Sequence, residues 1–129
     1  MYVVIADDNE VVRKAICHLL ESDPRIAPCI EAANGEEAIK ATKESKPDVV
    51  VLDLSMPKMS GVEAARRIRK LRPSLPIILC SMYEDMLDMK FLHESGITAV
   101  VAKREAAGKL LPVIWALLGL QPTAIPAGV

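Results

Sequence analysis

Four short apolar runs in this chain each end directly before polar residues that can handle phosphate or a metal ion. The runs and the residues that follow them are 2–6 with Asp7 and Asp8, 49–52 with Asp53, 77–80 with Ser81, and 99–102 with Lys103. Unbroken aliphatic runs of this length are typical of parallel strands buried on both faces. The ligand site of an open α/β sheet lies beyond the carboxyl ends of its strands. The runs therefore predict that three carboxylates, a hydroxyl and an ammonium group meet at one edge of a sheet.

The segments between these runs have the spacing of amphipathic helices, with apolar residues three and four positions apart. Helices are expected after Asp8 with Asn9 as the N-cap, over residues 36–45, after Ser60, over residues 84–95 before Gly96, and from near Gly108. The last helix is expected to start late because a proline, here Pro112, is tolerated only in the first turn of a helix.

A further strand is expected within residues 26–33, at a sheet edge or starting late, because Pro28 cannot donate a ladder hydrogen bond. Five strands then alternate with five helices. This alternation predicts an α/β fold with a single doubly wound, five-stranded parallel sheet. Residues 1–118 are expected to form this domain. Residues 119–129, which include Pro122 and Pro126, are expected to form a flexible tail or truncated linker.

Composition limits the classes of partner. A chain of 129 residues with a formal net charge of −1 has the size of one domain and no basic surface for nucleic acid. The longest apolar stretch, residues 110–120, is too short to cross a bilayer, and no signal-peptide pattern precedes the first strand, so a cytoplasmic protein is expected. Cys17, Cys29 and Cys80 show no metal-ligand spacing, which favours reduced thiols over disulfides or a zinc site.

The predicted cluster has the composition of a magnesium and phosphate site. Three aspartates close together raise one another's pKa unless a cation intervenes. Mg²⁺ (or Mn²⁺) suits such oxygen ligands and is bound by one or two carboxylates together with a phosphate. Asp53 can then act as a nucleophile toward a phosphoryl group and form an acyl phosphate. Lys103 offsets charge on the phosphoryl oxygens, and Ser81 can donate a hydrogen bond to one of them after the group arrives.

Each of these residues also has a simpler explanation when it is considered alone. An Asp-Asp pair after a strand is commonly only a helix N-cap, and a serine at a strand end or a lysine at the surface is ordinary. Their joint placement, each directly after its own apolar run, favours a shared site. Other polar residues are expected to be solvated at the surface, namely Arg66, Arg67, Arg69, Lys70, His18 and His93.

Over residues 2–118 the chain resembles the receiver domain of two-component response regulators. The matching segments, in order, are residues 5–9, 51–61, 76–81 and 101–103. The second segment is the most specific, because its Asp53, Met56-Pro57 and Gly61 have the spacing of the family. The resemblance implies the flavodoxin-like (βα)5 fold and the branch of the family whose receivers precede LuxR-type helix-turn-helix output domains.

The resemblance also implies a role for each residue at the strand ends. Asp53 would accept a phosphoryl group from a phosphohistidine on a sensor histidine kinase. Ser81 would be the switch hydroxyl and Lys103 the phosphate contact. The implied ligands of Mg²⁺ are Asp8, Asp53, the backbone carbonyl of Ser55 and, through a water, Asp7.

Phosphorylation would change the face built from the fourth helix, the fifth strand and the last helix, where a partner, an attached output domain or a second copy would bind. Two positions depart from the family pattern. Val100 stands where an aromatic residue is usual, with Tyr83 as a candidate substitute, and Arg104 stands where proline is frequent.

Two alternatives stay open at this point. A degenerate receiver would bind a partner constitutively, although the predicted phosphoacceptor, switch and metal residues are all present. A small Mg²⁺-dependent aspartyl-phosphate phosphatase of the haloacid dehalogenase type would need an Asp-x-Asp motif after the first strand, which Asp7-Asp8-Asn9 does not supply. We therefore expect a signalling domain that catalyses only its own phosphorylation and dephosphorylation.

Overall fold

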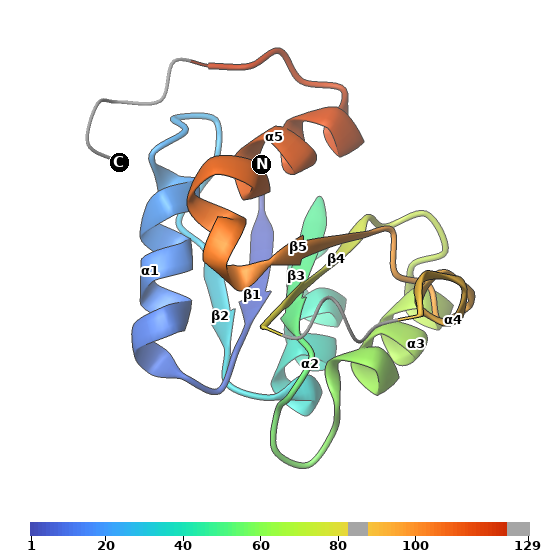
Figure 1. Cartoon of the computed structure of the whole chain (residues 1–129). Helices are drawn as coiled ribbons and strands as arrows, with labels where there is room; N and C mark the ends of the chain where they lie inside the picture. Colours follow the sequence, from blue (N-terminus) through green and yellow to red (C-terminus); the bar gives the residue numbers. More distant parts are fainter. Residues whose placement is uncertain (83–87, 124–129) are drawn as a thin grey trace.

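The structure, a computed structural model, describes residues 1–82 and 88–123. Its centre is a five-stranded parallel sheet with the strand order β2-β1-β3-β4-β5 (Figure 1). The strands are β1 (Val3–Ala6), β2 (Ile30–Ala32), β3 (Val49–Asp53), β4 (Ile77–Ser81) and β5 (Ala99–Ala102). The predicted α/β fold with one doubly wound parallel sheet is confirmed.

Helices cover both faces of the sheet. They are α1 (Glu10–Glu21), α2 (Gly35–Ser45), α3 (Gly61–Leu71), α4 (Met89–Glu94) and α5 (Ala106–Leu118), with the short 3₁₀ helix η2 (Lys103–Glu105) leading into α5. Helices α1 and α5 pack on one face, and α2, α3 and α4 pack on the other (Figure 1). Among the described residues, no helix combines the length and the apolarity needed to cross a bilayer.

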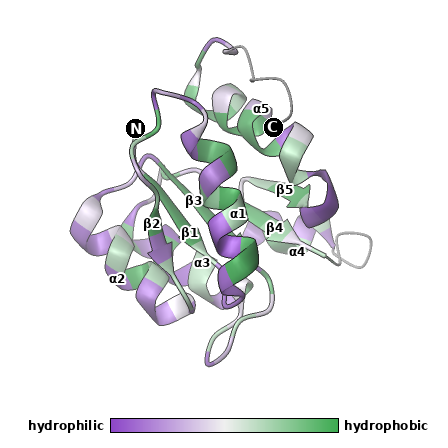
Figure 2. Ribbon diagram, turned by 90° about the vertical axis from the view of Figure 1, so that its left-hand side faces the viewer, coloured by the Kyte–Doolittle hydropathy of each residue, from purple (hydrophilic) through white to green (hydrophobic). Residues whose placement is uncertain are grey.

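The two faces of the sheet build two separate core layers. Successive side chains of a strand point to opposite faces. In β1, Val3 and Ile5 therefore pack toward α1 and α5, whereas Val4 and Ala6 pack toward the other helices. This burial on both faces explains why the strands are unbroken apolar runs, and Figure 2 shows the hydrophobic residues gathered on the central strands. The edge strand β2 starts late, after Pro28, as expected.

The helix N-caps follow the sequence closely. Asn9 Oδ1 accepts a hydrogen bond from the Val12 N–H at 3.1 Å and caps α1. Ser60 Oγ accepts one from the Glu63 N–H at 3.2 Å and caps α3. Both caps were predicted. Asn34 caps α2 in the same way, so this helix begins at Gly35, one residue before the predicted start.

Two helix starts differ from the prediction. Helix α5 begins at Ala106 and continues through Pro112. Pro112 and Gly108, four residues before it, are both exposed, so the Gly108 carbonyl that loses its helical partner faces water. Helix α4 begins at Met89, because Asp88 is extended (φ −84°, ψ 110°) and caps it. The predicted first turn, residues 84–87, lies outside the described residues.

Arg69 is an exception to the predicted solvated surface. Its guanidinium donates hydrogen bonds to the Gly96 carbonyl at 2.6 Å and 3.2 Å and to the carbonyls of Arg72 and Pro73. Gly96 has φ +93°, and an added Cβ would lie 2.8 Å from the Cβ of Arg69. Arg69 therefore ties the end of α3 to the turn before β5. Arg66, Arg67, Lys70, His18 and His93 are exposed as expected.

Candidate functional site

The carboxyl ends of four adjacent strands place the predicted residues at one edge of the sheet. Asp7 and Asp8 follow β1, Asp53 is the last residue of β3, Ser81 is the last residue of β4, and Lys103 follows β5. These strands are neighbours in the order β1-β3-β4-β5. The register pairs Asp53 with Cys80 and Ser81 with Ala102, so the polar residues stand at similar heights.

Three carboxylates and one ammonium group form the centre of this edge. One carboxylate oxygen from each of Asp7, Asp8 and Asp53 lies within 4.8 Å of the other two. Lys103 Nζ lies 2.8 Å from Asp7 Oδ2 and 3.1 Å from Asp53 Oδ1. Asp7 and Asp53 are buried, with exposed fractions of 2% and 8%, whereas Asp8 is exposed. Solvent therefore reaches the cluster from the side of Asp8.

The charges of the cluster are only partly balanced. Burial raises the pKa of Asp53 above its ordinary value, the charge of Asp7 raises it further, and Lys103 offsets part of both effects. Burial alone would lower the pKa of Lys103, but its contacts with Asp7 and Asp53 outweigh burial and raise that pKa. Lys103 therefore stays charged, and the surroundings of Asp53 disfavour its ionised carboxylate.

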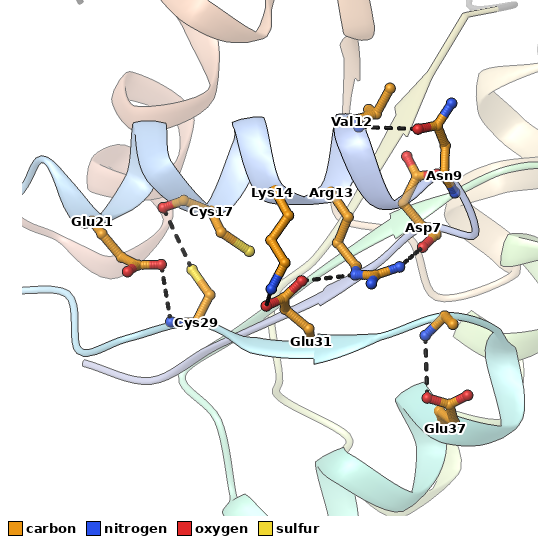
Figure 3. A network of polar contacts seen from close by, with 11 residues as sticks. Asp7, Asn9, Val12, Arg13, Lys14, Cys17, Glu21, Cys29, Glu31 and Glu37 are labelled. Carbon is orange, nitrogen blue, oxygen red and sulfur yellow. Dashed lines mark hydrogen bonds and ion pairs between the residues drawn. The ribbon is translucent and has the colours of Figure 1, made fainter.

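The backbone and side chain of Asp7 are fixed by contacts that the sequence pattern did not predict. The Asn9 N–H donates to Asp7 Oδ1 at 2.9 Å, and Arg13 Nη1 donates to the Asp7 carbonyl at 2.8 Å. Arg13 Nε also pairs with Glu31 Oε1 at 2.8 Å, which links α1 to β2 (Figure 3). The sequence feature that could have predicted the Arg13 contact with Asp7 is a basic residue one turn into the helix after β1.

The residues present fit a hard divalent cation. Within the described part of the chain, Asp7 Oδ2 is a buried side-chain oxygen that accepts no aligned hydrogen bond, although Lys103 Nζ forms an ion pair with it. A buried oxygen in that condition can accept a further ligand. Two more carboxylates lie beside it, and an all-oxygen donor set of this kind suits Mg²⁺.

The loop after β3 approaches the Asp53 backbone closely. The Gly61 N–H donates to the Leu54 carbonyl at 2.8 Å. An added Cβ on Gly61 would lie 2.2 Å from the Asp53 carbonyl oxygen, so only glycine allows α3 to start there. This contact holds Asp53 at the sheet edge. Ser55, the predicted carbonyl ligand, is exposed in the same loop.

Comparison with known proteins identifies the family. Residues 3–114 match the protein family described as the response regulator receiver domain. The chain belongs to this family. Two-component signalling is thus its context, and the resemblance seen in the sequence is confirmed.

The similar proteins carry this domain in different settings. The chain is 46% identical over 79 residues to a protein-glutamate methylesterase/protein-glutamine glutaminase of Halalkalibacterium halodurans, which covers 61% of this chain and 22% of that protein. It is 41% identical over 85 residues to the uncharacterized transcriptional regulatory protein YhcZ of Bacillus subtilis, covering 66% of this chain and 40% of that protein. This chain thus spans less than half the length of either relative.

A solved structure agrees with the fold over almost the whole chain. The crystal structure of a LuxR-family two-component response regulator from Aurantimonas sp. SI85-9A1 matches with a TM-score of 0.84 and 30% sequence identity. The match covers 97% of this chain and 89% of that one.

Two further positions of this receiver domain were singled out in the sequence. Ser81 is fully buried at the end of β4, next to Ala102 of β5. Val100 is half-buried in β5 and packs with the core layer of α2, α3 and α4, so an aliphatic residue occupies the place that the family usually gives to a ring. Tyr83, the candidate substitute, lies outside the described residues.

Proposed function

We propose that this receiver domain is a phosphorylatable switch in which Asp53 accepts a phosphoryl group from a phosphohistidine on a sensor histidine kinase. The observation that carries the proposal is the position of Lys103, which lies 3.1 Å from Asp53 Oδ1 at an edge that already holds Asp7 and Asp8. Such an arrangement combines a nucleophile with a fixed positive charge beside it, which phosphoryl transfer requires.

In the transfer, a carboxylate oxygen of Asp53 forms a bond to phosphorus while the bond from phosphorus to the imidazole nitrogen breaks. The electron pair of that bond returns to the imidazole. Lys103 favours the ionised, attacking form of Asp53 against the effect of burial. After transfer, Lys103 faces the added phosphoryl oxygens, and Ser81 is one residue beyond the strand position paired with Asp53.

The proposed ligands of Mg²⁺ (or Mn²⁺) are Asp8, Asp53, the backbone carbonyl of Ser55 and, through a water, Asp7. When bound, the ion supplies positive charge for the phosphoryl oxygens. Lys103 alone cannot balance three carboxylates and an incoming phosphoryl group, so we propose that phosphorylation depends on the ion.

The proposed response to phosphorylation is a change in what the receiver domain binds. We propose that phosphorylation acts through Ser81 on the face formed by α4, β5 and α5, and that this face binds an output domain, a downstream protein or a second copy. The likeness to a LuxR-family regulator and to a transcriptional regulatory protein supports transcription as the output. In this proposal residues 1–118 are the cytoplasmic receiver and residues 119–129 are a tail or linker.

The match to the methylesterase covers 22% of that protein, and residues 3–114 match the receiver family, so the similarity lies in the receiver part. We propose that the domain catalyses only its own phosphorylation and dephosphorylation. A degenerate receiver and a small aspartyl-phosphate phosphatase are the alternatives that the experiment below separates.

The test is labelling with radioactive acetyl phosphate, with and without Mg²⁺. We expect label on the wild type only with Mg²⁺, and none on Asp53→Asn. Asp48→Asn is the matched control, because Asp48 is an exposed aspartate immediately before the other end of β3. Label on Asp53→Asn would contradict the proposed acceptor. A wild type that binds Mg²⁺ but takes no label would show a degenerate receiver, and turnover of simple phosphate esters that is lost with Asp7→Asn would show a phosphatase.

A further inference from the structure

A second group of metal-ligating side chains lies at the far end of α1 from the acidic edge (Figure 3). Its members are Cys17 and Glu21 of α1 and Cys29, which precedes β2. One ligand atom from each lies within 4.8 Å of the other two. Cys17 and Glu21 are four residues apart, so one helical turn places them on the same side of α1. The fold therefore brings together two cysteines whose spacing in the sequence does not indicate a shared metal site.

Direct contacts already hold this group together. The Cys29 N–H donates to Glu21 Oε2 at 3.3 Å, and Cys29 Sγ lies 3.9 Å from the Cys17 carbonyl oxygen. Cys17 is 5% exposed and Cys29 is half-buried. A surface cavity of about 610 Å³ is lined by Cys17, Glu21 and three neighbours on α1 and by Glu31 of β2, so solvent and small ions can reach Cys17 and Glu21.

The carboxylate of Glu21 brings a negative charge to the group. Lys14 lines the same cavity, and its Nζ pairs with Glu31 Oε2 at 2.7 Å (Figure 3). No Lys or Arg among the described residues forms an ion pair with Glu21.

We propose that Cys17, Glu21 and Cys29 bind a thiophilic divalent cation of the Zn²⁺ class, with a water from the cavity completing a tetrahedral set. Two sulfurs and one carboxylate suit Zn²⁺, whereas Mg²⁺ prefers an all-oxygen set such as the acidic edge. Glu21 distinguishes this assignment from a disulfide, because a carboxylate has no part in a disulfide and disfavours the attacking thiolate. The ion would join α1 to the segment that enters β2.

The test uses the whole chain, metal-free and with all three thiols reduced, and takes Co²⁺ as the spectroscopic probe. Thiolate ligation produces a sulfur-to-cobalt charge-transfer band, and a tetrahedral set produces strong visible bands. The acidic edge, which offers only oxygen ligands, produces neither, so this result is independent of the Mg²⁺ site. Zn²⁺ is then titrated in to displace Co²⁺ and to measure its affinity.

We expect both bands in the wild type. Cys17→Ser and Cys29→Ser should each remove the charge-transfer signal of a two-thiolate site and lower Zn²⁺ affinity by more than about 100-fold, because loss of a direct ligand exceeds the usual outer-shell effect. Glu21→Gln should retain the charge-transfer band, because both thiolates remain, and should lower Zn²⁺ affinity by less than either cysteine variant, because the neutral amide oxygen is a weaker ligand in the same place. Cys80→Ser is the matched control, since Cys80 is buried in β4 away from the group, and it should bind as the wild type does.

Three results would overturn the proposal. The first is a wild type with three titratable thiols and no charge-transfer band. The second is retention of the wild-type band and affinity by Cys29→Ser or Cys17→Ser. The third is a fall from three free thiols to one in air that excess Zn²⁺ does not slow, which would identify a disulfide pair instead. Cys29 is half-buried and Glu21 exposed, so their variants keep the test informative if Cys17→Ser fails to fold.

Discussion

Two buried aspartates in this receiver domain have opposite electrostatic environments. Asp23, which is 1% exposed, accepts hydrogen bonds from the Arg25 N–H, Nε and Nη2 at 2.9–3.1 Å and from Trp115 Nε1 at 2.8 Å. Asp53, which is 8% exposed, has Lys103 at 3.1 Å and the like charges of Asp7 and Asp8 beside it. The two side chains are buried to a similar extent, but more hydrogen-bond donors surround Asp23 than Asp53.

The difference in donors sets the direction of each pKa shift. Hydrogen bonds from Arg25, followed by the one from Trp115, lower the pKa of Asp23 to about 2. Burial and the charge of Asp7 raise the pKa of Asp53. A fully partnered carboxylate stabilises the fold, here by joining the turn after α1 to α5. A carboxylate left short of partners costs stability, and a cation or a phosphoryl group can relieve that cost.

The largest expected effect comes from the same substitution at both positions. Asp23→Asn should lower the free energy of unfolding by about 3 kcal/mol at pH 7, because it removes a buried charge from its donors. Asp53→Asn should leave it unchanged or raise it, because it removes repulsion with Asp7. Urea denaturation measures both values. Equal destabilisation by the two variants would show that burial, not the balance of partners, determines the difference.

Lys103 provides the next largest effect. Lys103→Met should lower the free energy of unfolding by about 2–3 kcal/mol at pH 7, because it leaves the carboxylates of the edge without their ammonium partner. Millimolar Mg²⁺ should restore much of this loss. Lys109→Met is the control, since its ion pair with Glu105 is exposed and is worth less than about 1 kcal/mol. A loss at Lys103 that neither Mg²⁺ nor lower pH reduces would indicate lost packing.

The pH dependence of stability should show the two aspartates with opposite signs. The folded-state pKa of Asp23 is about 2 against an ordinary 3.8, so its contribution of about 2 kcal/mol is present above pH 4 and is lost as the pH falls toward 2. The folded-state pKa of Asp53 is raised, so the folded state holds that proton more tightly. Stability should therefore decline as the pH rises from the ordinary value of 3.8 through the raised one.

Urea unfolding of the wild type, Asp23→Asn and Asp53→Asn over this pH range separates the two contributions. Asp23→Asn should remove the loss on the acid side, and Asp53→Asn should remove the decline toward neutral pH. If Asp53→Asn instead shows a steeper decline than the wild type, the raised pKa of Asp53 is contradicted.

The sheet and the convergence at its edge could be predicted because both depend on chain order alone. Apolar runs buried on both faces indicate parallel strands. The residue after each run lies at the carboxyl edge of the sheet, and this position does not depend on how the helices pack. The Trp115 contact with Asp23, 92 residues away in the chain, could not be predicted in this way. Contacts of this kind depend on how side chains point between packed elements, and the grouping of Cys17 with Cys29 is another example.

The start of α5 shows a second limit. A rule based on residue type places Pro112 in a first turn, but the cost of an interior proline depends on whether the freed carbonyl meets water. Pro112 lies on the exposed side of α5, and that is a property of the packed helix. Similarly, α4 begins directly after Asp88 because the Asp88 side chain caps the helix.

The smallest expected effect tests whether the acidic edge depends on the helix that follows β1. Asn9→Ala should lower the free energy of unfolding by about 1 kcal/mol, because it removes the N-cap of α1. Asn34→Ala is a matched control, since Asn34 caps α2 by the same contact, to the Glu37 N–H at 2.9 Å. Both should cost the same stability in urea. Only Asn9→Ala should weaken Mg²⁺ binding, by a few-fold in an amide-shift titration. Alanine keeps the backbone N–H that donates to Asp7 Oδ1, but loss of the cap loosens the start of α1, which positions this N–H and Asp8. Equal Mg²⁺ affinity in the two variants would contradict this dependence. It would mean that β1 alone fixes the carboxylates and that the sheet, without α1, determines the geometry of the acidic edge.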